Sequence, residues 1–137
     1  MGIQTEPLHD TVYIGAITGS ADAIYPVMMA NRHLNVVSCA VTTNANVTKV
    51  SNKFWNVILQ NRGTTGSSTT TVASRATNST LITAYMPWTL INSTTLANLD
   101  ICSGETLAIK VDGTGSKNGT GFAVTIRYAI GTAYSTT

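Results

Sequence analysis

Apolar and polar residues alternate with a period of two along much of the chain, which is the pattern of strands that have one buried face. The alternation is cleanest over residues 122–130, where every second position is large and apolar. Residues 54–61 and 106–111 follow the same rule over shorter lengths. We therefore predict strands in all three segments, and we expect the last one to be central or well paired in its sheet.

Further strands are predicted where short apolar runs lie between turn residues. These strands cover residues 11–17, 24–30, 34–43, 80–86 and 88–91. Pro26 has no amide N–H to donate, so the strand that contains it is expected at a sheet edge or with an irregular start. The polar tract 63–71 is predicted to be a long exposed loop, and residues 93–99 are compatible with a short helical turn.

About eight short strands, with no sustained helical period and no internal repeat, predict an all-β fold. The expected architecture is a β-sandwich or jelly roll of antiparallel strands that forms a single domain over residues 11–137. Residues 1–10 are polar, contain Pro7 and show no period, which predicts an N-terminal arm. Ile3 and Leu8 are isolated apolar residues in this arm, and we expect them to be its anchors on a neighbouring subunit or on the surface to which the assembly binds. The alternative is a frayed terminus with no role in assembly.

The glycine-rich segment 112–121 precedes the last strand and raises the question of a phosphate-binding loop. Such a loop leads into a helix whose N-terminal N–H groups face the anion. Here an alternating, strand-like segment follows the glycines, and Lys117 is not preceded by glycine. The pattern instead predicts a hairpin that joins strand 106–111 to the last strand.

Composition strengthens the all-β prediction. Threonine, which is β-branched and suited to strands, supplies about one residue in six. Charged residues make up only 10% of the chain, against about 25% in an average protein. The low charge and apolar residues beyond the needs of one inner face, such as Val37, Val41, Ala123 and Ala129, predict a homo-oligomer, most simply a trimer.

Charge and hydropathy also bear on partners. The net charge is +2, and the eight basic residues are scattered singly, so nucleic acid is not an expected partner. No apolar run approaches the roughly 18 residues of a membrane-spanning helix, and the N-terminus lacks the pattern of a signal peptide. We therefore expect neither a membrane partner nor secretion.

Candidate catalytic and metal-binding residues are sparse. The two histidines, His9 and His33, have no metal-ligand spacing to Cys, Asp or Glu, and no G-x-S-x-G segment marks a nucleophile. Asp100 and Glu105 are close in sequence, but they flank a turn and are expected in solvent. We predict that the protein is not an enzyme and binds no cofactor or metal.

Two further sets of residues leave alternatives open. Cys39 and Cys102 lie in apolar, strand-like segments and are expected to be buried free thiols, although a disulfide between them stays possible. The aromatic residues in the predicted strands are Tyr25, Phe54, Trp55, Tyr85 and Trp88. Aromatic residues in strands are typical of a core or a subunit interface, and the alternative is a platform on which a sugar stacks.

Three segments resemble parts of known virion proteins. Residues 23–37 (AIYPVMMANRHLNVV) resemble the early strands of small tailed-phage head proteins, and residues 104–115 with 121–128 resemble their closing strands and glycine–threonine loop. The chain is thus similar to the capsid decoration (cement) proteins of tailed bacteriophages. The resemblance extends in general pattern over residues 11–130, but residues 62–100 match nothing in that family.

The resemblance implies a jelly-roll β-sandwich that trimerises and stabilises a capsid by binding its major capsid protein at local symmetry axes. It implies a location on the capsid surface of the virion, after synthesis in the host cytoplasm. It assigns no functional residue to this chain. The alternative function is a carbohydrate- or receptor-binding module of a phage tail or head fibre, using Trp55 or Trp88 and the loop 63–71.

Overall fold

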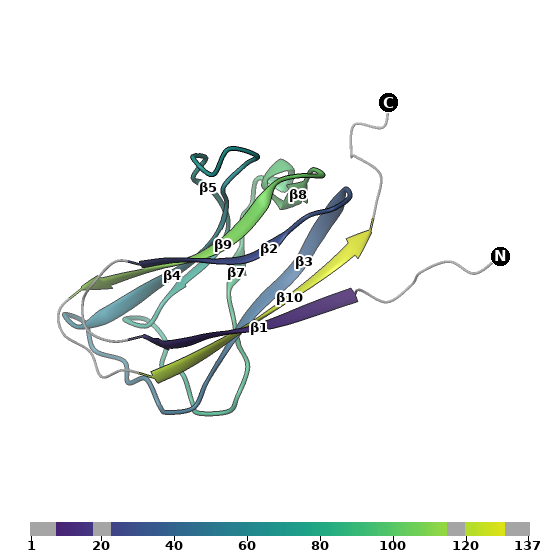
Figure 1. Ribbon diagram of the computed structural model, residues 1–137. Coiled ribbons are helices and arrows are strands. Elements are labelled where there is room, and N and C mark those ends of the chain that lie inside the picture. Colours follow the sequence, from purple (N-terminus) through teal and green to yellow (C-terminus); the bar gives the residue numbers. More distant parts are fainter. Residues whose placement is uncertain (1–7, 18–22, 115–119, 131–137) are drawn as a thin grey trace.

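Two antiparallel sheets of five strands each form the computed structural model of the protein, which describes residues 8–17, 23–114 and 120–130 (Figure 1). The predicted all-β sandwich is therefore confirmed. The elements are β1 (Leu8–Ile17), β2 (Ala23–Met29), β3 (Leu34–Thr43), β4 (Phe54–Asn61), β5 (Thr70–Ala76), β6 (Trp88–Thr89), β7 (Ile91–Asn92), the 3-10 helix η1 (Leu96–Leu99), β8 (Asp100–Ile101), β9 (Thr106–Thr114) and β10 (Thr120–Ile130).

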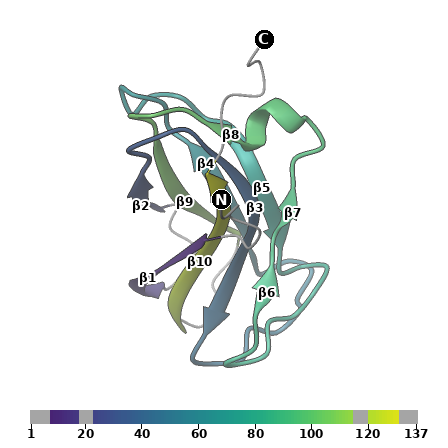
Figure 2. The same cartoon turned by 90° about the vertical axis from the view of Figure 1, so that its right-hand side faces the viewer.

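Strands from the beginning of the chain pair with strands from its end. One sheet has the order β1-β10-β3-β6, with β8 also paired to β3, and the other has the order β2-β9-β4-β5-β7. The first strand therefore pairs with the last, and the second strand pairs with the last but one. This order leaves β1 and β2 as edge strands, and Figure 2 shows them on the same side of the sandwich, opposite β6 and β7.

The core lies between the two sheets and follows the predicted alternation. The largest fully buried side chains come from both sheets and, in the case of Ile82, from the segment between β5 and β6: Val41, Trp55, Val57, Leu59, Val72, Ile82, Ile101, Leu107, Ile109, Val111, Phe122 and Ile126. Each buried side chain of this size contributes about 1.5–3 kcal/mol relative to an exposed one, so this layer holds the sheets together. Val41 belongs to this core and is fully buried, so it cannot contribute to an oligomer surface as predicted.

Several local predictions are confirmed. β10 is paired on both sides, with β1 and β3, as its unbroken alternation predicted. β2 is an edge strand, and its register with β9 shifts between Pro26 and Met28, as expected from the missing N–H of Pro26. The helical turn expected within residues 93–99 is η1.

The predicted hairpin over residues 112–121 is wrong. β9 lies in the sheet of β2 and β4, whereas β10 lies in the sheet of β1 and β3, so the connection passes from one sheet to the other. The glycines between two alternating strands predicted a turn but carried no information on which sheet each strand joins. The conclusion that a strand, and not a helix, follows these glycines is confirmed by β10.

Other boundaries differ from the predictions. Residues 80–86 form no strand, because only Ile82 pairs, in an isolated bridge with Val47, before the chain turns at Tyr85. β5 was not predicted, since its threonines and serine resemble the polar loop before it. That loop ends at residue 69, because β5 begins at Thr70. β1 begins at Leu8, so residues 8–10 of the predicted arm are part of the sheet.

Candidate functional site

A hollow lies where β1 and β10 come close to the end of β2. It is a cleft of about 190 Å³. Its lining combines apolar and polar side chains: Asp10, Met28, Met29, Asn31, Arg32, Leu34, Tyr128 and Ile130. We call this feature the edge cleft, because the strands on its two sides are the edges of the two sheets.

Exposed apolar side chains surround the edge cleft. Met29 is 64% exposed, and Ile130 is 37% exposed at the end of β10. Leu8 is 36% exposed and pairs with Tyr128, so it extends the same apolar surface along β1. Methionine is flexible and polarisable, and it adapts its shape to a partner surface. The edge cleft is thus suited to contact with another protein surface.

Polar groups form one wall of the edge cleft. The hydroxyl of Tyr128 donates a hydrogen bond to Oδ2 of Asp10 at 3.2 Å, across the β1–β10 pair. Partial desolvation and the neighbouring Asp10 carboxylate raise the pKa of Tyr128, which keeps this donor protonated. Arg32 is exposed on the turn after β2 and places a cation at the rim. The cleft can therefore recognise a partner by charge as well as by apolar contact.

The turn that carries Asn31 and Arg32 is anchored to a second turn. The N–H of Ala30 donates to the carbonyl of Glu105 at 2.9 Å, and the N–H of Gly104 donates to the carbonyl of Ala30 at 2.7 Å. Gly104 has φ of +89°, a conformation that glycine adopts without strain. These two bonds fix the rim of the edge cleft relative to the start of β9.

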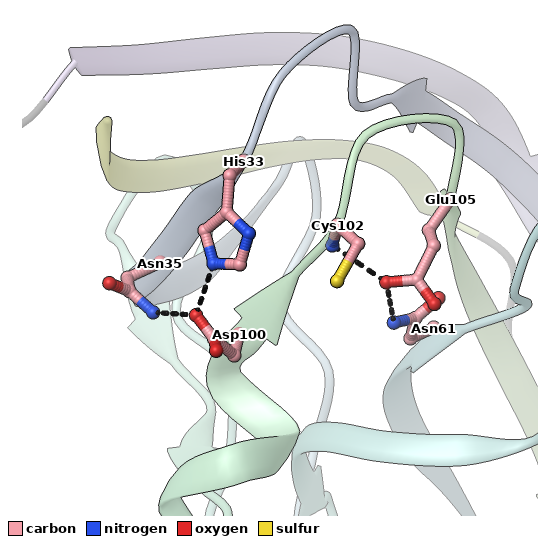
Figure 3. A network of polar contacts seen from close by, with 6 residues as sticks. All are labelled: His33, Asn35, Asn61, Asp100, Cys102 and Glu105. Atoms are coloured by element: carbon pink, nitrogen blue, oxygen red, sulfur yellow. Dashed lines mark hydrogen bonds and ion pairs between the residues drawn. The ribbon is translucent and has the colours of Figure 1, made fainter. Parts of the chain in front are cut away.

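A polar network next to this pair of turns joins four segments of the chain (Figure 3). Oδ1 of Asp100 lies 2.7 Å from Nε2 of His33 and accepts a bond from Nδ2 of Asn35 at 2.6 Å. The His33 and Asp100 side chains are only 18% and 17% exposed. Asp100 therefore acts as a shared acceptor that ties β8 to the start of β3.

Glu105 is the second acceptor of the network. Its Oε1 accepts bonds from the backbone N–H of Cys102 at 2.7 Å and from Nδ2 of Asn61 at 3.1 Å (Figure 3). The prediction that Asp100 and Glu105 are turn residues in solvent is thus wrong for both side chains. A slight desolvation, and then the charges of Glu105 and Asp100, raise the pKa of the Cys102 thiol.

The bonding in this network holds its two carboxylates in place. Oδ1 of Asp100 and Oε1 of Glu105 each have two polar partners within the protein. Within residues 8–17, 23–114 and 120–130, no group of three or more His, Cys, Asp and Glu residues is placed to hold a metal ion. We interpret the network as a structural clamp for the rim of the edge cleft.

The two predicted anchor residues have different outcomes. Ile3 lies outside the described residues. Leu8 lies in β1 and is partly exposed beside the edge cleft, so it is available for a contact.

The proposed sugar platform on tryptophan is not present. Trp55 is fully buried, and Trp88 is 5% exposed beneath the guanidinium of Arg75, whose Cζ lies 5.0 Å from the ring centroid. Neither ring offers a face to a ligand. Both belong to the core, which was the interpretation favoured for aromatic residues in strands. Of the aromatic residues considered, Tyr85 is the most exposed, at 75%.

The two cysteines are not joined by a disulfide, and both are free. Cys39 is buried in the core, as predicted, and this burial raises its pKa to about 12. Cys102 is exposed, which differs from the prediction, because it lies in the turn between β8 and β9 and not within a strand.

Most residues of the edge cleft were not identified from the sequence. Met28, Met29 and Arg32 follow Pro26 in the sequence. The predicted edge position of the Pro26 strand was the one signal that this side of the sheet has no neighbouring strand. The meeting of Asp10 with Tyr128 and of His33 with Asp100 joins residues 118 and 67 positions apart. No pattern in a single sequence reports such long-range pairs.

No protein-family model matches the chain, and no curated protein matches it. In the part of the chain that the structure describes, no helix has the length and apolar character needed to cross a membrane.

Proposed function

We propose that this chain is a structural virion protein, a jelly-roll decoration (cement) protein that binds and stabilises a phage capsid as a homotrimer. Its partners are further copies of itself and the major capsid protein. Its location is the capsid surface of the virion, and its role requires no catalysis.

The pairing of β1 with β10 and of β2 with β9 supports the jelly-roll part of this proposal. A chain whose first strand pairs with its last, and whose second strand pairs with its last but one, is the arrangement expected when a long antiparallel ribbon rolls into two sheets. Jelly rolls occur in viral capsid proteins and in lectins.

The observation that carries the proposal is the edge cleft. Two sheet edges lie on one side of the sandwich, and between them Met29 and Ile130 expose apolar surface beside the opposed charges of Asp10 and Arg32. Exposed apolar surface with a polar rim is typical of protein–protein contact sites. A decoration protein needs such a lateral surface to reach its neighbours on the lattice.

The edges themselves disfavour contact through backbone pairing. β2 carries Pro26 and a register shift, and β1 carries a register shift next to Gly15. Proline and bulges are devices that prevent an edge strand from accepting another strand. We therefore place the subunit contact on the side chains of the edge cleft, not on an added strand.

The first test is the oligomeric state. Light scattering on the purified protein is expected to give the mass of a trimer, and Met29→Glu is expected to give a monomer, because it places a carboxylate in the contact. Ile91→Glu is the matched control, since Ile91 is 67% exposed on the opposite side of the sandwich. A monomeric wild-type protein at high micromolar concentration contradicts the proposed assembly.

The second test is the capsid. The purified protein is mixed with undecorated heads of a phage that encodes it, and co-sedimentation and resistance of the heads to disruption are measured. The proposal predicts saturable binding and more resistant heads. Deleting residues 2–7, while keeping β1 intact, tests the predicted arm: undiminished oligomerisation and head binding would remove its role in assembly.

A further inference from the structure

A second hollow lies at the far end of the same sheet from the edge cleft. It is a groove of about 210 Å³ whose walls include Tyr13 and Tyr85 and whose floor includes Gly121 and Ala123. β3 reaches from Leu34 in the edge cleft to Thr43 in this groove, so the two sites are roughly 30 Å apart. We call this feature the tyrosine groove.

Two aromatic rings at the groove are unusually exposed. Tyr13 is 66% exposed and Tyr85 is 75% exposed, and they come from β1 and from the turn before β6. Tyrosine presents an apolar ring face together with a hydroxyl group, which suits it to partners that are apolar on one surface and wet at the rim. The pair is therefore a candidate binding platform.

The backbone at Tyr85 is strained in a way that presents the ring. Its φ is +62°, and it is the one non-glycine residue with positive φ among the described residues. The N–H of Tyr85 donates to the carbonyl of Thr43 at 2.8 Å, which holds this conformation against the end of β3. Strain of this kind in a bulky residue is concentrated at functional sites, and core packing does not account for it because the side chain is exposed.

Gly121 forms the floor beneath the other ring. A Cβ at this position would lie 2.7 Å from the hydroxyl oxygen of Tyr13 and 3.1 Å from a carbon of its ring. A glycine thus lets the Tyr13 ring lie close to the sheet. Covering a glycine in a strand with an aromatic ring is a structural role, and Tyr13 fulfils that role alone. This role does not explain why Tyr85 is held near Tyr13.

Asn44 adds a directed polar group to the groove. Its Oδ1 accepts bonds from the N–H of Gly121 at 2.9 Å and from Oγ1 of Thr120 at 3.0 Å, which fixes the orientation of the amide. Among the described residues, Nδ2 of Asn44 donates to no partner. A ligand in the groove can therefore accept hydrogen bonds from an amide that is already oriented.

We propose that the tyrosine groove binds one pyranose ring of a glycan. A pyranose has an apolar C–H face that stacks on aromatic rings and a rim of hydroxyl groups that pair with an amide and with phenolic hydroxyls. The groove is smaller than the roughly 300–1,000 Å³ of sites for drug-sized ligands, which fits a single ring.

The inference is independent of assembly through the edge cleft. The protein would carry a sugar-binding site at one end of the sheet and a protein contact at the other. Since each site has its own residues, failure of one proposal leaves the other standing.

The test is saturation-transfer NMR with the full-length protein. The probes are the methyl pyranosides of glucose, galactose, mannose and N-acetylglucosamine, with cyclohexanol as an apolar ring of similar size. The proposal predicts saturation of the C–H protons of at least one pyranoside. Titration of that sugar is expected to show binding weakened about tenfold or more in Tyr13→Ala, which corresponds to about 1.4 kcal/mol.

Tyr85→Gly separates a binding role from a structural one. Glycine adopts positive φ without strain, so this variant is expected to melt at a higher temperature while its sugar signal is lost. Gly121→Ala keeps both rings but displaces Tyr13, and it is expected to weaken binding with little loss of stability, because the exposed ring can move away. Ile91→Glu, an exposed position on β7 that lines neither hollow, is the control and should leave the sugar signal unchanged.

Three results overturn the proposal. The first is the absence of saturation on every pyranoside, and the second is a sugar signal that persists in Tyr85→Gly and Tyr13→Ala. The third is saturation of cyclohexanol alone, which would make the groove an apolar contact site for protein.

Discussion

Trp55 and Phe122 meet edge to face between the two sheets, with ring centroids 5.5 Å apart and planes at 76°. Trp55 lies on β4 and Phe122 lies on β10, so the contact joins strands that belong to different sheets. Both rings are fully buried. This geometry places the positive edge of one ring on the negative face of the other, which adds about 0.5–1.5 kcal/mol to the gain from burial.

Phe122→Ala is predicted to lower the free energy of unfolding by about 3–5 kcal/mol, because it removes the ring contact and leaves a cavity between the sheets. Urea unfolding followed by tryptophan fluorescence measures this loss, and the emission of the native state should shift to longer wavelength as Trp55 gains access to water. Phe54→Ala is the control, since Phe54 precedes Trp55 and is only partly buried on the other face of β4. Equal losses in the two variants would contradict this account of the core.

Ile126→Asp is predicted to prevent folding. Ile126 is fully buried on the central strand β10, and an unpaired carboxylate there costs several kcal/mol, which is comparable with the stability of a small domain. Circular dichroism and the yield of dispersed protein measure the outcome. Arg127→Asp changes the adjacent, exposed residue and should fold normally. A cooperatively melting Ile126→Asp protein would refute the assigned position of this side chain.

The sequence was informative where local pattern determines structure. β3 and β4 coincide with the predicted residues 34–43 and 54–61, because their side chains alternate and their ends carry polar or turn residues. The edge position of β2 followed from one residue, Pro26, since a missing N–H is a local property. The fold class could be predicted for the same reason.

The errors arose where distant parts of the chain decide the outcome. β5 is polar in composition yet pairs with β4 and buries Val72 and Ala73, so its neighbours and not its residues make it a strand. The partner sheets of β9 and β10 likewise depend on packing across the sandwich. The edge cleft and the tyrosine groove each combine residues from both halves of the chain, and no period in the sequence connects them.

Asp100 and His33 are predicted to be energetically coupled. In a double-mutant cycle with Asp100→Ala and His33→Ala, we expect a coupling free energy of about 1 kcal/mol, because the two side chains share a 2.7 Å contact that is mostly shielded from water. The measurement is the unfolding free energy of the four proteins. A parallel cycle combines Asp100→Ala with His9→Ala, which changes a histidine on β1. In that cycle the two changes in unfolding free energy should add. Additivity in the His33 cycle would exclude a structural clamp at this position.

The two thiols are predicted to differ in reactivity. A thiol-specific reagent should modify Cys102 in the native protein, because it is exposed, and Cys39 only after unfolding. Reaction proceeds through the thiolate, and the raised pKa of Cys102 slows it near neutral pH relative to a free thiol. Glu105→Gln removes one of the charges that raise this pKa and should accelerate the labelling. Modification of two thiols per native chain would contradict the burial of Cys39.

Cys39 is predicted to make stability depend on pH in the alkaline range. Burial raises its pKa in the folded protein to about 12, from 9.0 for an ordinary thiol. The folded state therefore keeps the proton while the unfolded chain releases it, so this contribution to stability is complete below pH 9.0 and is lost as pH rises toward 12.

Within that interval the loss is about 1.4 kcal/mol for each pH unit. Urea unfolding of the wild-type protein and of Cys39→Ala, measured side by side, isolates this effect because all other titrating groups are shared. Cys39→Ala should be less stable by a constant amount below the interval, since it loses packing in the core. Above the ordinary thiol pKa the gap should shrink, because only the wild-type unfolded chain gains a thiolate. A gap that stays constant through the whole interval would mean that Cys39 ionises equally in both states, and so that its side chain is not shielded from water.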